Sequence, residues 1–330
     1  MKDIYILAIE TSCDETSASI IKNGNIEIGT VVLSQMDTHK KYGGVVPEIA
    51  SRMHIENITL VFEELFEKTN LNMDNIDYIG VTNGPGLIGS LLIGIQAAKT
   101  ISFIYNKPLI PINHLHGHIY ANRLIGDFKF PLIALIISGG HTDIIYMEKD
   151  FSFKKIGSTK DDAVGETYDK VARIMDISYP GGPLVDKLSY EGKPIYKLPI
   201  PLDDNSYDFS FSGLKTAVRN LYNTSPNINK EDLCSSFQDV VVKIITKKTM
   251  RAVKEYNVKQ LLISGGVAAN SGLRTKFKEL CEENNIELLI PPIKYCTDNA
   301  AMIGCAAYYA IKNDIFSENE LSAFSTTDVK

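Results

Sequence analysis

The sequence predicts an α/β protein whose two halves repeat one arrangement of strands. An apolar strand over residues 4–12 runs into a polar turn and two further strands, and the same order recurs from residue 132. Between and after these hairpins, stretches with helical hydrophobic spacing alternate with short apolar runs, which is typical of strands joined by helices. Because the pattern occurs once in each half, the sequence indicates a duplicated fold with mixed sheets.

Composition places the chain among ordinary globular proteins. A length of 330 residues suits two domains or two halves of one large fold, and hydrophobic residues make up 44% and charged residues 22%. The formal charge of −6 argues against indiscriminate coating of nucleic acid, although it leaves room for a local basic patch.

Cysteine usage and the N-terminus predict a cytoplasmic protein. The five cysteines form no C-x-x-C pair and no even-numbered framework, which favours free thiols in a reducing compartment. The apolar start ends at Glu10 and lacks the flanking features of a signal peptide. No uninterrupted apolar run approaches the length of a membrane span, so we expect no membrane association.

The first half is predicted to open with three antiparallel strands and to continue with helices and further strands. The strand over residues 18–21 returns along the first, and Asn23-Gly24 is a hairpin signal before a third strand. Further strands are expected over residues 26–33, 76–81 and 110–112. Helices are expected after residues 43–47, from Ile88 and over residues 119–124.

The second half is predicted to repeat the opening strands and then to alternate helices with short strands. Strands are expected over residues 132–137, 143–147, 151–156, 260–263 and 286–290. Helices are expected over 164–175, after 209–215, over 230–256, after 264–270 and, capped near 297–299, through Ile311. A turn is expected at 179–183 and a frayed tail at 313–330. We therefore divide the chain into lobes 1–130 and 131–330, with a C-terminal helix that can pack back on the first lobe.

Three of the six histidines fall within one segment, residues 113–118. If a helix starts near His114, then His114 and His118 stand at positions i and i+4 and share one face. Two imidazoles placed in this way can bind one metal ion, whereas His116 projects from the other side. The alternative is that these are simply polar residues at a helix start.

Glycine-rich turns indicate a nucleotide site. The turn Ser138-Gly139-Gly140 lets the backbone approach a phosphate without a Cβ in the way. The turn at residues 11–16 and the turn at 264–270 supply two comparable loops. The P-loop and Rossmann fingerprints are absent, so the sequence predicts a nucleotide site between two duplicated lobes.

Ten segments spread over almost the whole chain resemble the TsaD/Gcp family of bacterial tRNA N6-adenosine threonylcarbamoyltransferases. They are IETSCDETSASI, YGGVVPEIASRMH, NGPGLIGSLLIG, NHLHGHIYA, LIISGGHTDII, VGETYDKVARIM, YPGGPLVDKL, FSFSGLKTAVR, SGGVAANSGLR and CTDNAAMIG. The resemblance implies a duplicated ribonuclease-H-like fold of two lobes, the fold of actin, sugar kinases and heat-shock chaperone ATPases. It also implies transfer of a threonylcarbamoyl group from threonylcarbamoyl-AMP to N6 of the adenosine beside the anticodon, in tRNAs that read codons beginning with A, with release of AMP.

The resemblance further implies the residues of the site. His114, His118 and Asp298 are expected to bind one divalent metal ion, iron or zinc. The adenine nucleotide that forms part of the substrate is expected to contact Ile136, Ile137, Ser138, Gly139, Gly140, Asp169, Gly182, Asp186 and Asn270.

The chemistry of these side chains suits such roles, and each has a simpler alternative. Asp298 supplies an oxygen ligand beside two imidazoles, or it caps a helix. Asp169 and Asp186 accept hydrogen bonds from ribose hydroxyls, or they are solvated carboxylates. Asn270 bonds an adenosine edge, or it holds its turn. The catalytic candidates Asp14 and Glu15 orient the attacking amine or the tRNA end, or they form a solvated turn.

Partners implied by the resemblance are tRNA, the degenerate paralogue TsaB and the ATPase TsaE. Two sets of cations are candidate contacts for tRNA phosphates, and a plain solvated surface is the alternative for both. The sets are Lys243, Lys247, Arg251 and Lys254, and Lys154, Lys155 and Lys160.

Three rival functions fit less of the sequence. A zinc metallopeptidase requires H-E-x-x-H, and Leu115 occupies the position of the glutamate. A kinase of the same fold accounts for the loops but gives no reason for two histidines and an aspartate. A non-catalytic nucleotide-dependent scaffold would have lost these histidines, and they are present.

Overall fold

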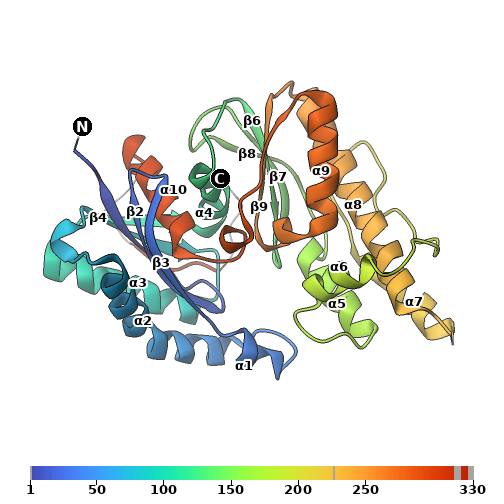
Figure 1. The fold of residues 1–330 in the computed structure, drawn as a ribbon, viewed down its shortest axis with the longest axis horizontal. Coiled ribbons are helices and arrows are strands. Elements are labelled where there is room, and N and C mark those ends of the chain that lie inside the picture. The colour runs from blue at the N-terminus through green and yellow to red at the C-terminus, as the bar shows by residue number, and fades with distance from the viewer. Residues whose placement is uncertain (1, 226, 316–320, 326–330) are drawn as a thin grey trace. The chain divides into compact units, whose positions relative to one another are not determined.

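The structure is a computed structural model that describes residues 2–225, 227–315 and 321–325. The chain forms two compact units, the first made of Met1–Asp127 and Thr297–Lys330 and the second of Phe128–Cys296. Each unit is built on one five-stranded sheet (Figure 1).

The first sheet has the strand order β3-β2-β1-β4-β5. Its strands are β1 (Tyr5–Glu10), β2 (Glu15–Lys22), β3 (Ile26–Ser34), β4 (Tyr78–Gly84) and β5 (Leu109–Asn113). β1, β2 and β3 pair antiparallel, whereas β1, β4 and β5 pair parallel. The sheet is therefore mixed, and the carboxyl ends of its three parallel strands meet at one edge.

The second sheet repeats this topology. Its strands are β6 (Leu132–Ile137), β7 (Thr142–Met147), β8 (Phe153–Ser158), β9 (Gln260–Ser264) and β10 (Glu287–Leu289). The order is β10-β9-β6-β7-β8, with β6, β7 and β8 antiparallel and β6, β9 and β10 parallel. The predicted duplication is thereby confirmed.

Helices cover both faces of the first sheet (Figure 1). The helices of this unit are α1 (Met36–Lys40), α2 (Pro47–Thr69), α3 (Ile88–Tyr105), α4 (His114–Tyr120) and α10 (Ala300–Lys312). α2 and α3 pack on the face to which Leu7 and Ile9 belong, and α10 packs on the other. Gly304 of α10 touches Ala8 and Ile21 so closely that a Cβ there would clash, which lets the helix lie flat on the sheet.

By length and composition alone, one helix of the described residues, α3, could cross a membrane. We had expected no apolar run of that length. α3 packs against α2 and β4, and its buried residues Leu91, Ile95 and Ala98 belong to the core of the first unit. A core helix of a soluble protein meets the same criterion, so the helix is weak evidence for a membrane.

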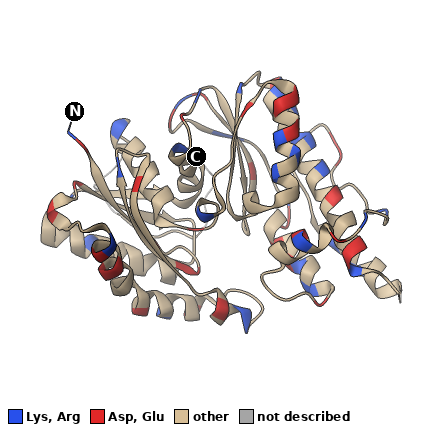
Figure 2. Cartoon of the chain, viewed as in Figure 1, with Lys and Arg blue, Asp and Glu red and all other residues tan. Residues whose placement is uncertain are grey.

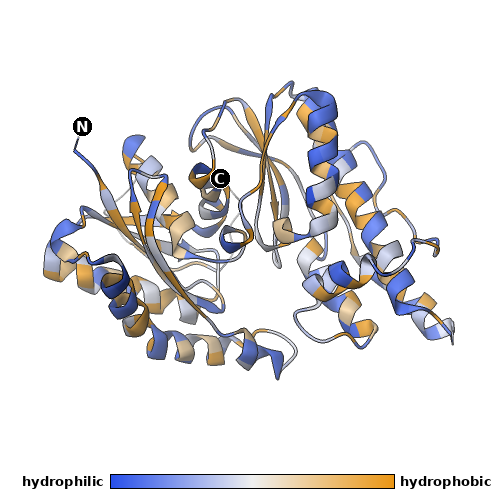
Figure 3. Cartoon of the chain, viewed as in Figure 1, coloured by the Kyte–Doolittle hydropathy of each residue, from blue (hydrophilic) through white to orange (hydrophobic). Residues whose placement is uncertain are grey.

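The second unit places its helices around one large core. These helices are α5 (Val164–Ile174), α6 (Gly181–Ser189), α7 (Ser212–Thr224), α8 (Lys230–Glu255) and α9 (Ser271–Asn284). Alternate residues of β6, namely Ile133, Leu135 and Ile137, enter the core. Figure 3 shows hydrophobic residues gathered on the strands and hydrophilic residues along α9.

Three expectations differ from the structure. Residues 131–330 do not form one unit, because α10 packs on β1 and β2 and belongs with the first unit, as its predicted return allowed. The expected turn at residues 179–183 instead opens α6. Within the predicted frayed tail, described residues contact the first unit: the Phe324 amide donates to the Asn83 carbonyl oxygen at 3.1 Å. Residues 316–320 and 326–330 of that tail lie outside the described residues.

Candidate functional site

The first unit holds a cluster of two histidines and an aspartate. α4 begins at His114 because Asn113 caps it, its side-chain oxygen accepting from the Leu115 amide at 2.8 Å. This start fixes the helical register in which His114 and His118 lie one turn apart on one face. His116 lies outside the cluster, and burial lowers its pKa to about 3, so that its ring is neutral.

Asp298 reaches this face because α10 packs tightly against α4. A Cβ on Gly117 would meet Ile303 and Met302, so glycine between the histidines permits the close approach. The cap of α10 is Asn299, whose side-chain oxygen accepts from the Met302 amide at 3.1 Å. Asp298 therefore does not serve as the helix cap.

The distances within the cluster suit one metal ion. Asp298 Oδ1 lies 3.4 Å from His114 Nε2 and 3.2 Å from His118 Nε2. Two ligands that each bind at about 2.0–2.2 Å around one ion lie roughly 3–3.5 Å apart. His118 is buried and its Nδ1 has no hydrogen-bond partner among the described residues. Two imidazoles and one carboxylate that leave further positions open are a typical catalytic donor set.

Glu10, which the sequence does not single out, binds His114 through Nδ1, the ring nitrogen that does not face Asp298. The carboxylate is fully buried, and its Oε2 accepts from His114 Nδ1 at 3.1 Å and from the Thr82 hydroxyl at 2.6 Å. A carboxylate bonded to one ring nitrogen orients the other toward a metal. A glutamate that ends an apolar strand, beside parallel strands that end at the same edge, is the signal that could have revealed it.

The electrostatics of the cluster favour a positive charge. Burial lowers the pKa of His114, but the negative charges of Asp298 and Glu10 outweigh it and raise that pKa to about 9. The same carboxylates that hold a proton on the ring would attract a metal cation in its place.

The catalytic candidates lie next to this cluster, Asp14 at the end of the β1–β2 turn and Glu15 at the start of β2. Burial, followed by the negative charges of Asp298 and Asp14, raises the pKa of Glu15 to about 10, so that its carboxyl group carries a proton at neutral pH. Glu15 also accepts from the Ser34 hydroxyl at 3.2 Å. A cation bound at Asp298 would offset part of this repulsion and favour the ionised form.

Another histidine, His54 of α2, holds the turn between β1 and β2 in place. It is fully buried, with Nε2 2.9 Å from the Cys13 carbonyl oxygen and Nδ1 2.7 Å from the Thr16 hydroxyl. Because a carbonyl oxygen only accepts, Nε2 carries the proton and Nδ1 accepts from Thr16. Burial lowers the pKa of His54, which keeps this tautomer neutral.

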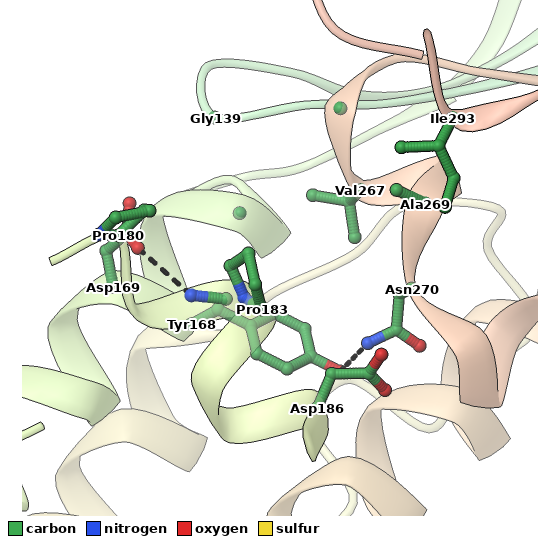
Figure 4. A pocket seen from close by; sticks show the side chains of 13 residues that line it. Gly139, Tyr168, Asp169, Pro180, Pro183, Asp186, Val267, Ala269, Asn270 and Ile293 are labelled. Atoms are coloured by element: carbon green, nitrogen blue, oxygen red, sulfur yellow. Dashed lines mark hydrogen bonds between the residues drawn. The ribbon is translucent and has the colours of Figure 1, made fainter. Parts of the chain in front are cut away.

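The second unit contains a pocket of 420 Å³ (Figure 4). Its walls come from the β6–β7 turn, α5, the start of α6 and the segment that leads into α9. Five residues expected at the nucleotide line it: Gly139, Asp169, Gly182, Asp186 and Asn270. Tyr168 and Pro183 lie between Asp169 on one side and Asn270 on the other (Figure 4), and with Val267 and Ile293 they supply apolar surface.

The polar residues of the pocket are already fixed by bonds within the unit. Asp169 Oδ1 accepts from the Gly181 amide at 2.8 Å and so caps α6 from a different helix. Burial raises the pKa of Asp169. Asn270 caps α9, its Oδ1 accepting from the Leu273 amide at 2.9 Å, and its Nδ2 donates to Tyr168 Oη at 3.3 Å.

Asp186 and the neighbouring Gln238 complete this network. Asp186 accepts from the amide and the hydroxyl of Ser271 at 3.0 and 2.6 Å, and from the Gln238 side chain. Gln238 in turn accepts from the Tyr168 hydroxyl at 2.6 Å. Tyr168 and Gln238 were not expected at the site, because their roles depend on residues far away in the sequence.

The other four expected nucleotide contacts do not line the pocket. The side chains of Ile136 and Ile137 are fully buried in β6. Ser138 closes the hairpin turn, its amide donating to the His141 carbonyl oxygen at 2.9 Å. A Cβ on Gly140 would meet open space, as would one on Gly139, so the glycines of this turn leave room for a ligand.

Several of the cations considered as tRNA contacts are held by the protein itself. Lys247 pairs with Asp203 at 2.5 Å and Lys160 with Asp208 at 2.8 Å. Arg251 donates to the Asp204 carbonyl oxygen at 3.2 Å and lies over the Tyr207 ring. Lys154 lies 5.9 Å from the centre of the Tyr256 ring. Four of these seven cations therefore form ion pairs or hydrogen bonds with neighbouring loops, or lie against aromatic rings of the protein itself.

Comparison with known proteins relates the chain to one family. The sequence model of the family described as TsaD, tRNA N6-adenosine threonylcarbamoyltransferase, matches residues 27–305. A protein with that name from Staphylococcus haemolyticus is 54% identical over 334 residues, covering 100% of this chain and 98% of the relative. Another from Staphylococcus aureus strain JH9 is 52% identical, covering 100% and 98%.

Solved structures of more distant proteins share the fold. Component A of (R)-2-hydroxyglutaryl-CoA dehydratase from Acidaminococcus fermentans aligns with a TM-score of 0.57 at 16% identity, covering 94% of this chain and 99% of that one. HypF from T. kodakarensis aligns with a TM-score of 0.62 at 13% identity, covering 94% of this chain and 48% of that one. At these identities the likeness concerns the fold alone.

Proposed function

The chain belongs to the TsaD family of tRNA N6-adenosine threonylcarbamoyltransferases. From this premise we propose which part of the substrate or which ion each of its two sites binds. The enzyme transfers a threonylcarbamoyl group to N6 of the adenosine beside the anticodon, in tRNAs that read codons beginning with A. The donor is threonylcarbamoyl-AMP, and AMP is released. The observation that carries this assignment is the 54% identity over the full length of a named relative.

The adenylate part of the donor occupies the pocket of the second unit. The apolar walls formed by Tyr168, Pro183 and Val267 suit an adenine ring, and the free carboxylate oxygen of Asp169 suits a ribose hydroxyl. The backbone of the Ser138–Gly140 turn is open enough to hold the phosphate. Asn270 and Asp186 keep this pocket in shape, because each is bonded to Gln238 or Tyr168.

His114, His118 and Asp298 of the first unit hold one divalent ion, iron or zinc. When bound, the ion supplies Lewis-acid polarisation of a carbonyl or phosphate oxygen. Glu10 accepts the Nδ1 proton of His114 and thereby keeps Nε2 available as a ligand.

The bonds exchanged in the reaction are simple. The N6 amine of the tRNA adenosine attacks the carbamoyl carbon, and the bond from that carbon to the phosphate oxygen breaks. AMP leaves with the electron pair, and the amine loses one proton. Asp14 and Glu15 are the side chains of the first unit that we assign to orienting the amine, since they lie beside the cluster.

We place this activity in the cytoplasm, together with TsaB and TsaE as partner proteins. The decisive test combines the purified chain with tRNA, threonylcarbamoyl-AMP and these partners, and measures the modified nucleoside by mass spectrometry. Formation of threonylcarbamoyladenosine at the position beside the anticodon is the expected result. Its absence with an active preparation of the partners would refute the proposed function.

A further inference from the structure

A cavity of the second unit, separate from the nucleotide pocket, is lined by cations. It has a volume of 310 Å³ and lies between α5 and α7. Six residues line it, and none of them is acidic: Lys170, Arg173, Ile174, Lys215, Thr216 and Arg219. In a chain with a formal charge of −6, four cations around one cavity are a concentration of positive charge that needs an explanation.

Two carboxylates behind the cavity order its lysines without neutralising it. Asp162 lies 2.7 Å from both Lys170 and Lys215, so that one aspartate joins α5 to α7. Glu166 lies 2.9 Å from Lys170. A third carboxylate, Asp169, interacts electrostatically with Arg173, so four cations against three carboxylates leave a formal charge of +1. Arg219 is exposed and takes part in none of these ion pairs.

Other cavities of the same unit have a different lining. One combines Lys197 and Lys243 with Asp239. Another combines Lys276 with Asp239 and Glu279. Both signs of charge also alternate along α8 and α9 (Figure 2). The cavity between α5 and α7 therefore differs from these two cavities in having no acidic residue in its lining.

The kind of anion follows from the lining. No aromatic or amide side chain is present to stack on a base or to read its edge. The cations form two pairs, each one helical turn apart, at positions i and i+3 on α5 and i and i+4 on α7. Such pairs rise about 4.5 and 6 Å along their helices. Two such pairs suit successive phosphates of a polynucleotide backbone better than a single small ion.

The position of the cavity on α5 links it to the nucleotide pocket. Gly165, Tyr168 and Asp169 line the pocket at positions i, i+3 and i+4. Lys170, Arg173 and Ile174 line the basic cavity with the same spacing, five residues further along α5. Five residues correspond to a rotation of about 140° between the two stripes. Their nearest members, Asp169 and Arg173, stand at positions i and i+4, so the two stripes adjoin along the helix.

We propose that the cavity between α5 and α7 binds phosphodiesters of the tRNA backbone, on a face of α5 that adjoins the one bordering the adenylate. This proposal rests on the proposed function, since it names the surface of the second unit that the tRNA contacts. The contact is independent of base sequence, because it involves backbone charge alone.

The test compares two variants of equal charge. Arg173→Gln/Arg219→Gln removes the two exposed guanidinium groups of the cavity and keeps the Asp162 network. Lys276→Gln/Lys278→Gln removes two cations of α9 in the same unit. The affinity of each full-length chain for tRNA, with its partner proteins present, is measured over a range of salt concentrations.

The arginine variant is expected to bind tRNA about tenfold more weakly at low salt, for every tRNA tested. The slope of the logarithm of the affinity against the logarithm of the salt concentration should fall by about 1.4–1.8, the value for two phosphates. The melting temperature should match the wild type, and the lysine variant should keep the wild-type slope.

Three outcomes overturn the inference. An unchanged affinity and slope in the arginine variant would remove the cavity from the tRNA surface, while tRNA modification by the wild type would still support the proposed function. Displacement of tRNA by inorganic phosphate at constant ionic strength would identify the cavity as a small-anion site. Failure of the wild type to bind or modify any tRNA would overturn the proposed function as well.

Discussion

At the scale of single residues, local spacing predicts more than long-range contact does. Once the segment is helical, the separation of His114 and His118 by four residues places both on one face, independent of contacts with the rest of the chain. Glu10, Tyr168 and Gln238 escape sequence analysis because each acts on a partner 70 to 104 residues away. The position of Glu10 at a strand end marks it as a candidate, but its histidine partner depends on how the strands pair.

The three histidines of α4 should differ in their effect on bound metal. Replacing His114, His118 or Asp298 by Ala removes one of three ligands, so each variant is expected to lose most of its metal and nearly all activity. His116→Ala should keep both, because His116 lies outside the cluster. Elemental analysis of the four folded variants, with transfer to tRNA, measures this. Metal lost from His116→Ala and retained in His118→Ala would refute the assigned ligands.

Glu10→Gln should weaken metal binding without removing a ligand. The amide cannot replace both acceptor oxygens of the buried carboxylate, so His114 loses its negatively charged partner. We expect the metal dissociation constant to rise roughly 10–100-fold, as for other carboxylates bonded to ligand histidines. Competition with a chelator gives this value. Thr82→Val is the control, because it removes the other side-chain donor to the same carboxylate and leaves the charge. An equal loss in both variants would point to general loosening of the strand ends.

At the scale of elements, periodicity and capping signals locate most strands and helices. Asn229, directly before the helix predicted from residue 230, caps α8, its side chain accepting from the Asp232 amide at 2.7 Å. α6 was missed because its start is capped by Asp169 from another helix, so that no local signal marks it. Pro183 lies in the first turn, where proline costs no internal helix bond.

The cap of α10 should control the metal site as well as the helix. Asn299 accepts from the Met302 amide and donates to the Thr297 carbonyl oxygen at 2.7 Å, so it shapes the turn that carries Asp298. Asn299→Ala is expected to lower the free energy of unfolding by about 1 kcal/mol and also to weaken metal binding. Denaturant unfolding and chelator competition measure the two effects.

A matched change on α8 separates stability from site geometry. Asn229→Ala removes an equivalent cap from the second unit, so it should cost a similar free energy and leave the metal dissociation constant unchanged. Asn299→Ser, which retains a capping oxygen, should recover most of the lost stability. If Asn229→Ala weakened metal binding as much as Asn299→Ala, the effect would be one of stability alone.

At the scale of the whole molecule, the sequence predicts the repeated strand order and allows a C-terminal helix to return to the first lobe, but it does not locate the boundary of that return. Each half carries the same hairpin signals, so the two sheets follow from the sequence alone. The return of α10 to the first unit depends on small residues: Gly304 permits contact with Ala8, and Gly117 permits contact with Ile303. No composition change at residue 297 marks that return. The fold is shared with component A of the dehydratase and with HypF, so the function resides in the residues placed on it.

The chain should therefore show no kinase activity despite a fold that sugar kinases share. Phosphoryl transfer to a sugar or to acetate gives no role to a cluster of two histidines and an aspartate, whereas attack on a carbamoyl carbon would use the Lewis acid that we propose for this cluster. With radiolabelled ATP and a panel of sugars and small carboxylic acids, incorporation of label is expected to stay at background. The same preparation must transfer threonylcarbamoyl to tRNA, which shows that it is active. Robust labelling that survives His114→Ala would assign the nucleotide pocket to phosphoryl transfer and leave the metal cluster without a catalytic role.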